Sequence, residues 1–145
     1  SSIVLEHIYM NAVNKKIQIN NMIRKEIMCS IDENMIMTVF RNLVSNAIKF
    51  TNEGGFINIK SSVDNERNEV VISIEDNGIG MSDEVLGKLF KIDTVIKQRG
   101  TNNETGTGLG LILCKEFVEI NKGRIWAESK EGIGSTFYFT IPLAS

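Results

Sequence analysis

Apolar residues repeat at helical spacing in three long stretches of the chain. The clearest repeat follows the i, i+3, i+4, i+7, i+11 pattern of a buried helix face, and it is formed by Ile36, Val39, Phe40, Leu43 and Ala47. Asp32 precedes it as an N-cap candidate, so this helix should run to about Phe50. Similar repeats predict helices at residues 3–14 and 109–121, and Gly123 stands where a left-handed C-cap of the latter would be.

Between the helical stretches, apolar and polar residues alternate, which predicts strands with one buried face. Four such strands are expected at residues 57–63, 70–74, 124–129 and 135–141. Polar residues at 64–68 and a glycine-containing turn at 130–134 should connect them as two hairpins.

Two shorter features complete the element list. Residues 16–19 and 26–31 are partly alternating and β-branched, and Asn20 with Asn21 favours a turn between them, so we expect a small hairpin. Ser82 followed by acidic residues predicts the capped start of a short helix that ends near Phe90.

Residues 91–105 lack a clear period and form a long connection, which is typical of a functional loop, and we interpret them as a mobile lid. The order of elements predicts an α+β two-layer sandwich. Its mixed β-sheet should have about five strands and be covered on one face by three helices.

The composition fits one domain that spans residues 1–145. The chain has 145 residues, 42% of them hydrophobic, which is enough for a single core without disulfides. Lys and Arg total 16 against 18 Asp and Glu, so no basic field is present to hold a nucleic acid or an anionic membrane surface.

The cysteines and the lengths of the apolar runs bear on where in the cell the chain works. Cys29 and Cys114 are far apart and surrounded by apolar residues, so we expect buried, reduced thiols and a cytoplasmic location. No apolar run approaches the roughly 18 residues needed to span a bilayer. The chain begins without Met, which suggests an excised piece, and this leaves open that the full-length protein is anchored in the inner membrane.

Three polar residues, Asn42, Asn46 and Lys49, lie along one line of the predicted helix 32–50. A solvated polar face is the ordinary reading of such a trio. However, Asn is a poor helix former, and its amide oxygen suits Mg²⁺, which takes only one or two protein ligands beside substrate phosphates.

Residues 76–80 combine an acid with two glycines directly after a strand. A hairpin turn is one reading, but a capped helix follows rather than a returning strand. Alternatively, Gly78 and Gly80 would let a flat ring approach the backbone, while Asp76 would accept a hydrogen bond from the exocyclic amine of adenine. Guanine presents a carbonyl oxygen at that position and would be repelled.

Three alternating glycines, Gly106, Gly108 and Gly110, lead into the last predicted helix. A flexible linker is one reading, and a phosphate-binding helix N-terminus is the other. The spacing fits neither a dinucleotide fingerprint nor a P-loop. The only histidine is His7, which argues against Ser-His-Asp catalysis and against zinc sites built on paired histidines. Eukaryotic-type protein kinases are excluded, because their catalytic His-Arg-Asp loop is absent.

Taken together, four segments resemble the catalytic ATP-binding domain of sensor histidine kinases, in order and spacing. They are residues 42–51, 76–80, 106–111 and 132–137. Residues 89–93 and 100–106 are most similar to those of hybrid sensor kinases. The resemblance implies the Bergerat fold, with ATP and Mg²⁺ bound between the helices and a lid at about 91–105.

The resemblance also implies roles for individual residues. Asn42, Asn46 and Lys49 would act in catalysis, with Asn46 as the magnesium ligand, and Thr136 would support Asp76 through a water. The residues expected at the nucleotide are Asn46, Lys49, Phe50, Asp76, Gly78, Gly80, Lys97, Arg99, Gly106, Thr107, Gly108, Leu109, Gly110, Leu111 and Thr136.

Related ATPases and serine-directed kinases carry a glutamate base where this chain has Asn42, so the resemblance implies a phosphate donor rather than an ATPase. The partner would be a histidine-containing dimerisation domain of the same protein, upstream of Ser1, and a response regulator receiver domain would act indirectly. A degenerate nucleotide-binding or ligand-sensing interaction module is the alternative. No nucleic-acid partner and no direct membrane contact are expected.

Overall fold

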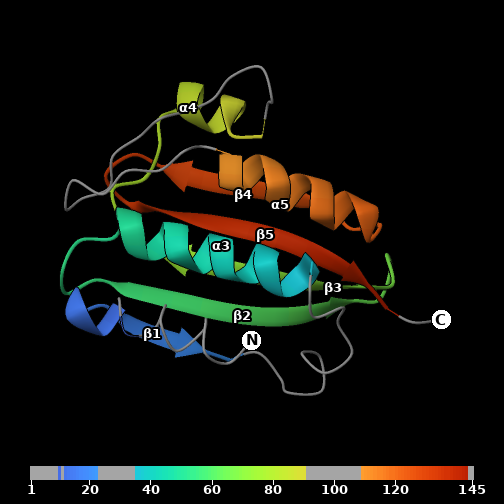
Figure 1. Cartoon of the computed structure of the whole chain (residues 1–145), viewed down its shortest axis with the longest axis horizontal. Helices are drawn as coiled ribbons and strands as arrows, with labels where there is room; N and C mark the ends of the chain where they lie inside the picture. The colour runs from blue at the N-terminus through green and yellow to red at the C-terminus, as the bar shows by residue number, and fades with distance from the viewer. Residues whose placement is uncertain (1–9, 11, 23–34, 91–108, 144–145) are drawn as a thin grey trace.

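The computed structural model describes residues 10, 12–22, 35–90 and 109–143, and residues 12–14 are helical. The helices and strands are, in chain order, β1 (Gln18–Asn21), α3 (Met35–Phe50), β2 (Phe56–Asp64), β3 (Glu69–Asp76), α4 (Asp83–Lys88), α5 (Leu109–Ile120), β4 (Ile125–Lys130) and β5 (Gly134–Pro142). Helices α3 and α5 lie side by side over one face of the sheet (Figure 1). The predicted two-layer sandwich is confirmed.

The sheet has five strands in the order β1-β2-β3-β5-β4. β1 runs parallel to β2, whereas β2–β3, β3–β5 and β4–β5 are antiparallel, so the sheet is mixed as predicted. The hairpins β2–β3 and β4–β5 are the two that the alternating pattern indicated. Strand β3 lies at the centre, and its last residue, Asp76, pairs in register with Ser135 of β5.

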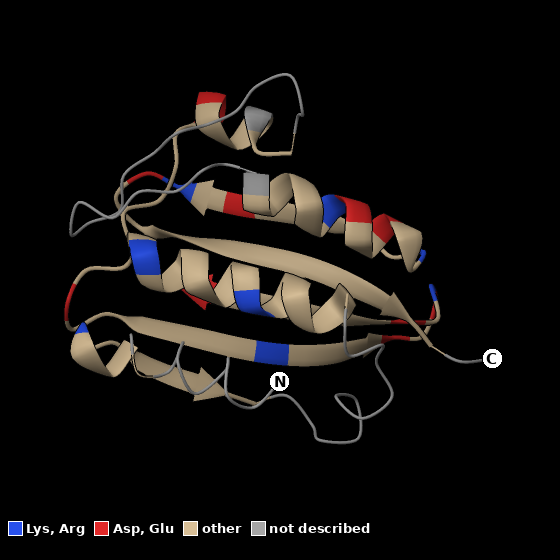
Figure 2. Cartoon of the chain, in the orientation of Figure 1, with Lys and Arg blue, Asp and Glu red and all other residues tan. Residues whose placement is uncertain are grey.

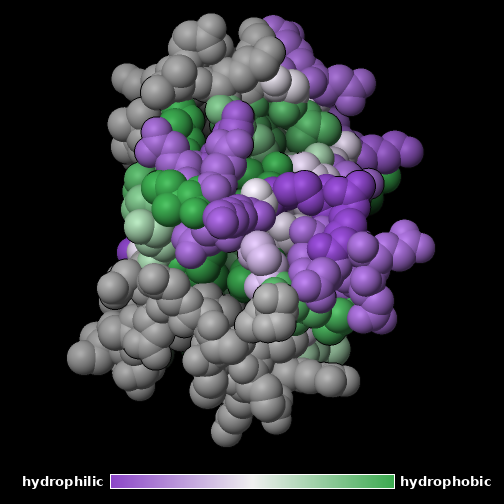
Figure 3. Space-filling model, turned by 90° about the vertical axis from the view of Figure 1, so that its right-hand side faces the viewer, coloured by the Kyte–Doolittle hydropathy of each residue, from purple (hydrophilic) through white to green (hydrophobic). Residues whose placement is uncertain are grey.

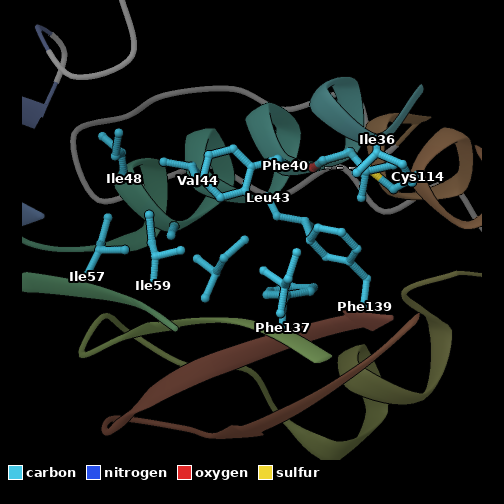
Figure 4. Close-up of a cluster of buried hydrophobic side chains, with 14 of the residues drawn as sticks. Ile36, Phe40, Leu43, Val44, Ile48, Ile57, Ile59, Cys114, Phe137 and Phe139 are labelled. Atoms are coloured by element: carbon cyan, nitrogen blue, oxygen red, sulfur yellow. Dashed lines mark hydrogen bonds between the residues drawn. The ribbon is translucent and has the colours of Figure 1, made fainter. Parts of the chain in front are cut away.

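One core fills the space between the sheet and the helices (Figure 4). Every residue of the predicted α3 stripe is buried, with at most 2% of its surface exposed. The strands supply alternate residues to the same core, among them Ile57, Ile59, Ile72, Ile74, Phe137 and Phe139. Burial of this apolar surface is the main force that holds α3 across the strands, since burial of apolar side chains stabilises by roughly 1.5–3 kcal/mol each.

The predicted turn at Asn20 and Asn21 is wrong, because both residues belong to β1. β1 pairs with a strand about 38 residues away, which local turn propensity does not indicate. The Asn20 amide donates to Asn58 Oδ1 at 2.9 Å, and Asn58 Nδ2 donates to Glu75 at 3.1 Å. These cross-strand bonds satisfy the amides within the sheet. Residues 26–31 lie outside the described part of the chain.

The predicted left-handed cap at Gly123 is displaced by one residue. Lys122 has the positive φ of 64°, while the Gly123 N–H donates to the Val118 carbonyl at 2.8 Å. This is the Schellman arrangement with lysine at the left-handed position. Gly123 is needed for a different reason, since a Cβ there would lie 2.1 Å from the Thr140 carbonyl oxygen.

The N-cap of α4 is confirmed, because Ser82 accepts a hydrogen bond from the Val85 N–H. None of the helices in the described ranges is long and apolar enough to span a membrane. Figure 3 shows the end of the molecule at which α5 and β2 terminate, and there polar side chains lie between smaller apolar patches. The predicted lid, residues 91–105, lies outside the described residues, as do Asp32 and most of the predicted first helix.

Candidate functional site

The predicted site residues that the structure describes gather mainly at one edge of the molecule. The C-terminal end of α3, the N-terminal end of α5 and the last residue of β3 meet at the left side of Figure 1. Lys49 is the basic residue in the last turn of α3 (Figure 2). The fold therefore brings together three segments that are well separated in the sequence.

Asn42 is directed at α5. A Cβ on Gly110 would lie 3.8 Å from Asn42 Oδ1, which is ordinary van der Waals contact. The Asn42 side chain also hydrogen-bonds Cys114, whose thiol donates to the Val39 carbonyl at 3.9 Å. Burial raises the pKa of Cys114 to about 12, although the Asn42 bond acts in the opposite direction. Asn42 therefore ties the two helices together beside a neutral thiol.

Asn46 lies one turn further along α3 and is half-buried. Among the described residues no hydrogen-bond partner for its amide is found, in contrast to Asn42. Lys49 follows on the same line of the helix, with its ammonium 5.2 Å from the centre of the Phe50 ring. As far as the described residues show, this half-buried amide is available to a ligand from outside the chain.

Asp76 is a buried acid, with 5% of its surface exposed. Its Oδ1 accepts the Gly78 N–H at 2.8 Å, and the Ser135 N–H is a second donor. Its pKa is raised from 3.8 to about 6, mainly by burial and to a smaller extent by the nearby Glu75, while both backbone bonds act in the opposite direction. The carboxylate is therefore held in place but poorly solvated, and a ligand amine would relieve this.

The structure does not support the predicted role of Thr136 beside Asp76. Thr136 pairs with Glu75, and its side chain lies on the outer sheet face with Tyr138. The reason is strand alternation, because Ser135 and Phe137 share the core face with Asp76 while the residue between them points away.

Ser135 is the residue that the sequence analysis missed. Its hydroxyl lies 2.8 Å from Ser129 Oγ, which in turn accepts the Met81 N–H at 2.7 Å. These bonds join the ends of β4 and β5 to the segment after Asp76. Side chains two residues apart in a strand share a face, so Ser135 could have been found as the residue two positions before the core residue Phe137.

The segment from Asp76 to Gly80 is not a hairpin turn, because it leads on to α4. A Cβ on Gly78 would lie 2.1 Å from the Phe50 carbonyl oxygen, which accepts the Ile79 N–H at 3.0 Å. Gly80 has φ of +69°, and a Cβ there would lie 2.1 Å from the Lys130 carbonyl oxygen. Both glycines are therefore required so that the segment can pass between α3 and the β4–β5 turn.

The glycine-rich segment is only partly described. Leu109, Gly110 and Leu111 form the first residues of α5, so a helix N-terminus lies opposite Asn42, as expected. Gly106, Thr107, Gly108, Lys97 and Arg99 lie outside the described residues. Within the described ranges, no group of three or more His, Cys, Asp or Glu side chains could hold a metal ion. A metal at Asn46 would therefore need ligands from water or from a bound substrate.

A hollow of about 400 Å³ lies where β3 ends and where the β4–β5 turn begins and ends. Its lining includes Asp76 and Ser135 as well as Glu75, Glu128 and Thr136. The hollow therefore reaches Asp76 from the β4–β5 side, and its lining includes no residue of α3 or α5.

The family profile described as "Histidine kinase-, DNA gyrase B-, and HSP90-like ATPase" matches residues 31–145. Sensor histidine kinase WalK of Bacillus subtilis is 34% identical over 141 residues, which are 97% of this chain and 23% of WalK. Phytochrome-like protein Cph1 of Synechocystis is 38% identical over 115 residues, or 79% of this chain and 15% of Cph1. The chain thus spans about a quarter or less of these relatives.

Solved structures show the same fold. Full-length ShkA in complex with AMPPNP has a TM-score of 0.75 and 25% identity, and the match covers 99% of this chain and 29% of ShkA. The nucleotide-free catalytic domain of histidine kinase ThkA has a TM-score of 0.71 and 28% identity, with coverage of 97% and 91%. The five-stranded mixed sheet under its helices is therefore the fold of histidine kinase catalytic domains, which confirms the expected Bergerat fold.

Proposed function

The chain belongs to the family of histidine kinase-, DNA gyrase B- and HSP90-like ATPases, and we propose that it binds ATP with Mg²⁺ and donates the γ-phosphoryl group to a histidine on a separate domain. The observation that carries the proposal is the half-buried amide of Asn46, which has no hydrogen-bond partner among the described residues and lies one turn after Asn42, the residue opposite Gly110 of α5. The AMPPNP complex of ShkA and the sensor kinase relatives support the same proposal.

Asp76 would recognise the adenine. Its pKa of about 6 leaves it ionised at neutral pH, and an ionised carboxylate only accepts hydrogen bonds, so it pairs with the exocyclic amine of adenine. Gly78 would hold this carboxylate in place through its N–H, while its missing Cβ lets the segment pass the end of α3. Because guanine presents a carbonyl oxygen at this position, we expect ATP to bind much more tightly than GTP.

Asn46 would hold the magnesium, and Lys49 with the N-terminus of α5 would hold the phosphates. A helix N-terminus offers free backbone N–H groups and a partial positive charge, which suits anionic oxygens. When bound, Mg²⁺ would neutralise charge that develops on the transferred phosphoryl group. The residues of this chain would orient the phosphate chain and exclude water from it.

Asn42 favours donation to a protein acceptor over hydrolysis. An amide does not accept a proton usefully at neutral pH, so no group at this position activates water. His7 lies outside the described residues, and the acceptor histidine is proposed to lie on a dimerisation domain elsewhere in the protein, with a response regulator receiving the phosphoryl group afterwards. Because the proposed acceptor lies on another domain, we expect this chain to transfer little phosphate by itself. We also propose that it works in the cytoplasm, where ATP is available.

Two measurements test the proposal. Asn46→Ala should abolish magnesium-dependent ATP binding, while Asn65→Ala, in the exposed β2–β3 turn, should bind as the wild type does. Unchanged affinity in Asn46→Ala would remove the metal assignment. Normal Mg-ATP binding without transfer to any supplied cognate histidine domain would favour the degenerate binding module instead of the kinase.

A further inference from the structure

Lys15 is a buried lysine that belongs to none of the sequence motifs. Only 6% of its surface is exposed. Its Nζ donates to the carbonyl oxygens of Ile48 at 2.9 Å and Lys49 at 3.0 Å. The last four carbonyls of an α-helix have no partner within the helix, so this ammonium caps the C-terminal end of α3 with a full positive charge.

The backbone around Lys15 is fixed beneath the end of α3. The Lys16 carbonyl accepts the Gly54 N–H at 3.1 Å, and the Gln18 N–H donates to the Gly55 carbonyl at 3.1 Å. Both partners belong to the turn between α3 and β2. The lysine is therefore held at this helix end by the chain on either side, and its position does not depend on a flexible side chain alone.

The capped turn carries the residues proposed to meet the phosphates. Lys49 supplies one of the two capped carbonyls, and Asn46 lies just before it on the same turn. A helix C-terminus carries a partial negative charge, and this charge would repel a triphosphate bound beside it. The ammonium of Lys15 lies directly on the carbonyls from which that charge arises.

We propose that Lys15 is a positioning residue for the phosphate end of the nucleotide. It holds the last turn of α3 in helical geometry and offsets the negative charge at that end, so that Asn46 and Lys49 can receive a magnesium-bound triphosphate. This inference rests on the proposed function, because it requires Mg-ATP to bind at this turn.

The test compares Mg-ATP with adenosine, which lacks phosphates. The variant Lys15→Met removes the charge and keeps the length of the side chain. Lys16→Met is the matched control, since it makes the same change in charge at an exposed neighbour. Dissociation constants for both ligands are measured by calorimetry at a temperature at which circular dichroism shows each variant fully folded.

We expect Lys15→Met to weaken Mg-ATP binding by about 5-fold to 30-fold, as for a charge at a helix end, and to leave adenosine binding unchanged. Lys15→Arg, which keeps the charge, should restore most of the Mg-ATP affinity. An equal loss for both ligands would show a merely structural role, and unchanged Mg-ATP binding in Lys15→Met would overturn the inference.

Two further outcomes are distinguishable. If Lys15→Met does not fold, Lys15→Gln replaces it, because the glutamine amide keeps an N–H donor without the charge; wild-type binding of Mg-ATP by that variant would also overturn the inference. If the wild-type chain and Lys16→Met bind adenosine but not Mg-ATP, the proposed function itself fails.

Discussion

The buried carboxyl of Asp76 should make the folding stability of this chain depend on pH in a direction opposite to that of most acids. Its pKa rises from 3.8 to about 6 in the fold because burial removes water from the charged form. Since the folded-state pKa lies above the unfolded one, the carboxyl stabilises the fold fully below pH 3.8, and this contribution is lost as pH rises through about 6.

The magnitude follows from the two pKa values. Each pKa unit corresponds to about 1.4 kcal/mol, so the complete effect is about 3 kcal/mol. Between pH 4 and pH 8 the linkage relation gives a loss of about 2 kcal/mol in the free energy of unfolding. The variant Asp76→Asn is neutral throughout this range and should lack that loss. Its amide cannot reproduce both backbone hydrogen bonds, so its absolute stability will differ by a further amount that does not depend on pH.

Urea unfolding of the wild type and of Asp76→Asn, without nucleotide, at pH 4, 5, 6, 7 and 8 measures the difference. We expect the wild type to lose about 2 kcal/mol relative to the variant from pH 4 to pH 8. Glu131→Gln, on an exposed residue of the β4–β5 turn, corrects for the loss of one negative charge. A flat difference, or one that favours the wild type at high pH, would refute the view that Asp76 is a desolvated acid.

Three further predictions concern packing and reactivity. Gly78→Ala should destabilise the fold by at least about 2 kcal/mol, because its Cβ would overlap the last carbonyl of α3, whereas Gly87→Ala has open space and should be neutral or stabilise by up to about 1 kcal/mol in thermal melts. Phe139→Ala should cost about 3–5 kcal/mol in urea unfolding, since that ring is fully buried; a cost below about 1 kcal/mol would contradict the core assignment. In a Cys29→Ser variant, the Cys114 thiol should resist thiol reagents at pH 8 in the native state and react after unfolding, because burial raises its pKa to about 12; rapid native labelling would disprove this.

The elements that local pattern predicted are those whose partners are close in sequence. The α3 stripe and the β2–β3 and β4–β5 hairpins depend on periodicity and on short turns, and all three are confirmed. β1 was misjudged because its partner strand is distant and because the Asn20 amide donates to a side chain of that strand. No local rule contains that information.

The site shows the same limit. Motif spacing placed Asn42, Asn46 and Asp76 on the elements where they lie, but it did not indicate which residue of β5 faces Asp76. That depends on sheet register, and register assigns the position to Ser135 rather than Thr136. Lys15 could not be found from sequence, because its partner carbonyls are 33 and 34 residues away and a carbonyl carries no sequence signal.

The two asparagines of α3 illustrate how closely fold and chemistry are joined. Asn42 contacts the Cys114 thiol, which is fully buried, and lies next to the first turn of α5. A carboxylate at position 42 would meet this neutral, desolvated thiol, and an unpaired charge there would be costly. An amide can serve the contact between the helices without that cost, but it cannot act as a base toward water. One turn later, Asn46 makes no such contact with the described residues, and we propose that it binds the ligand instead. The packing of α5 against α3 therefore favours an amide at position 42, and in the function proposed above the same amide would disfavour hydrolysis relative to transfer.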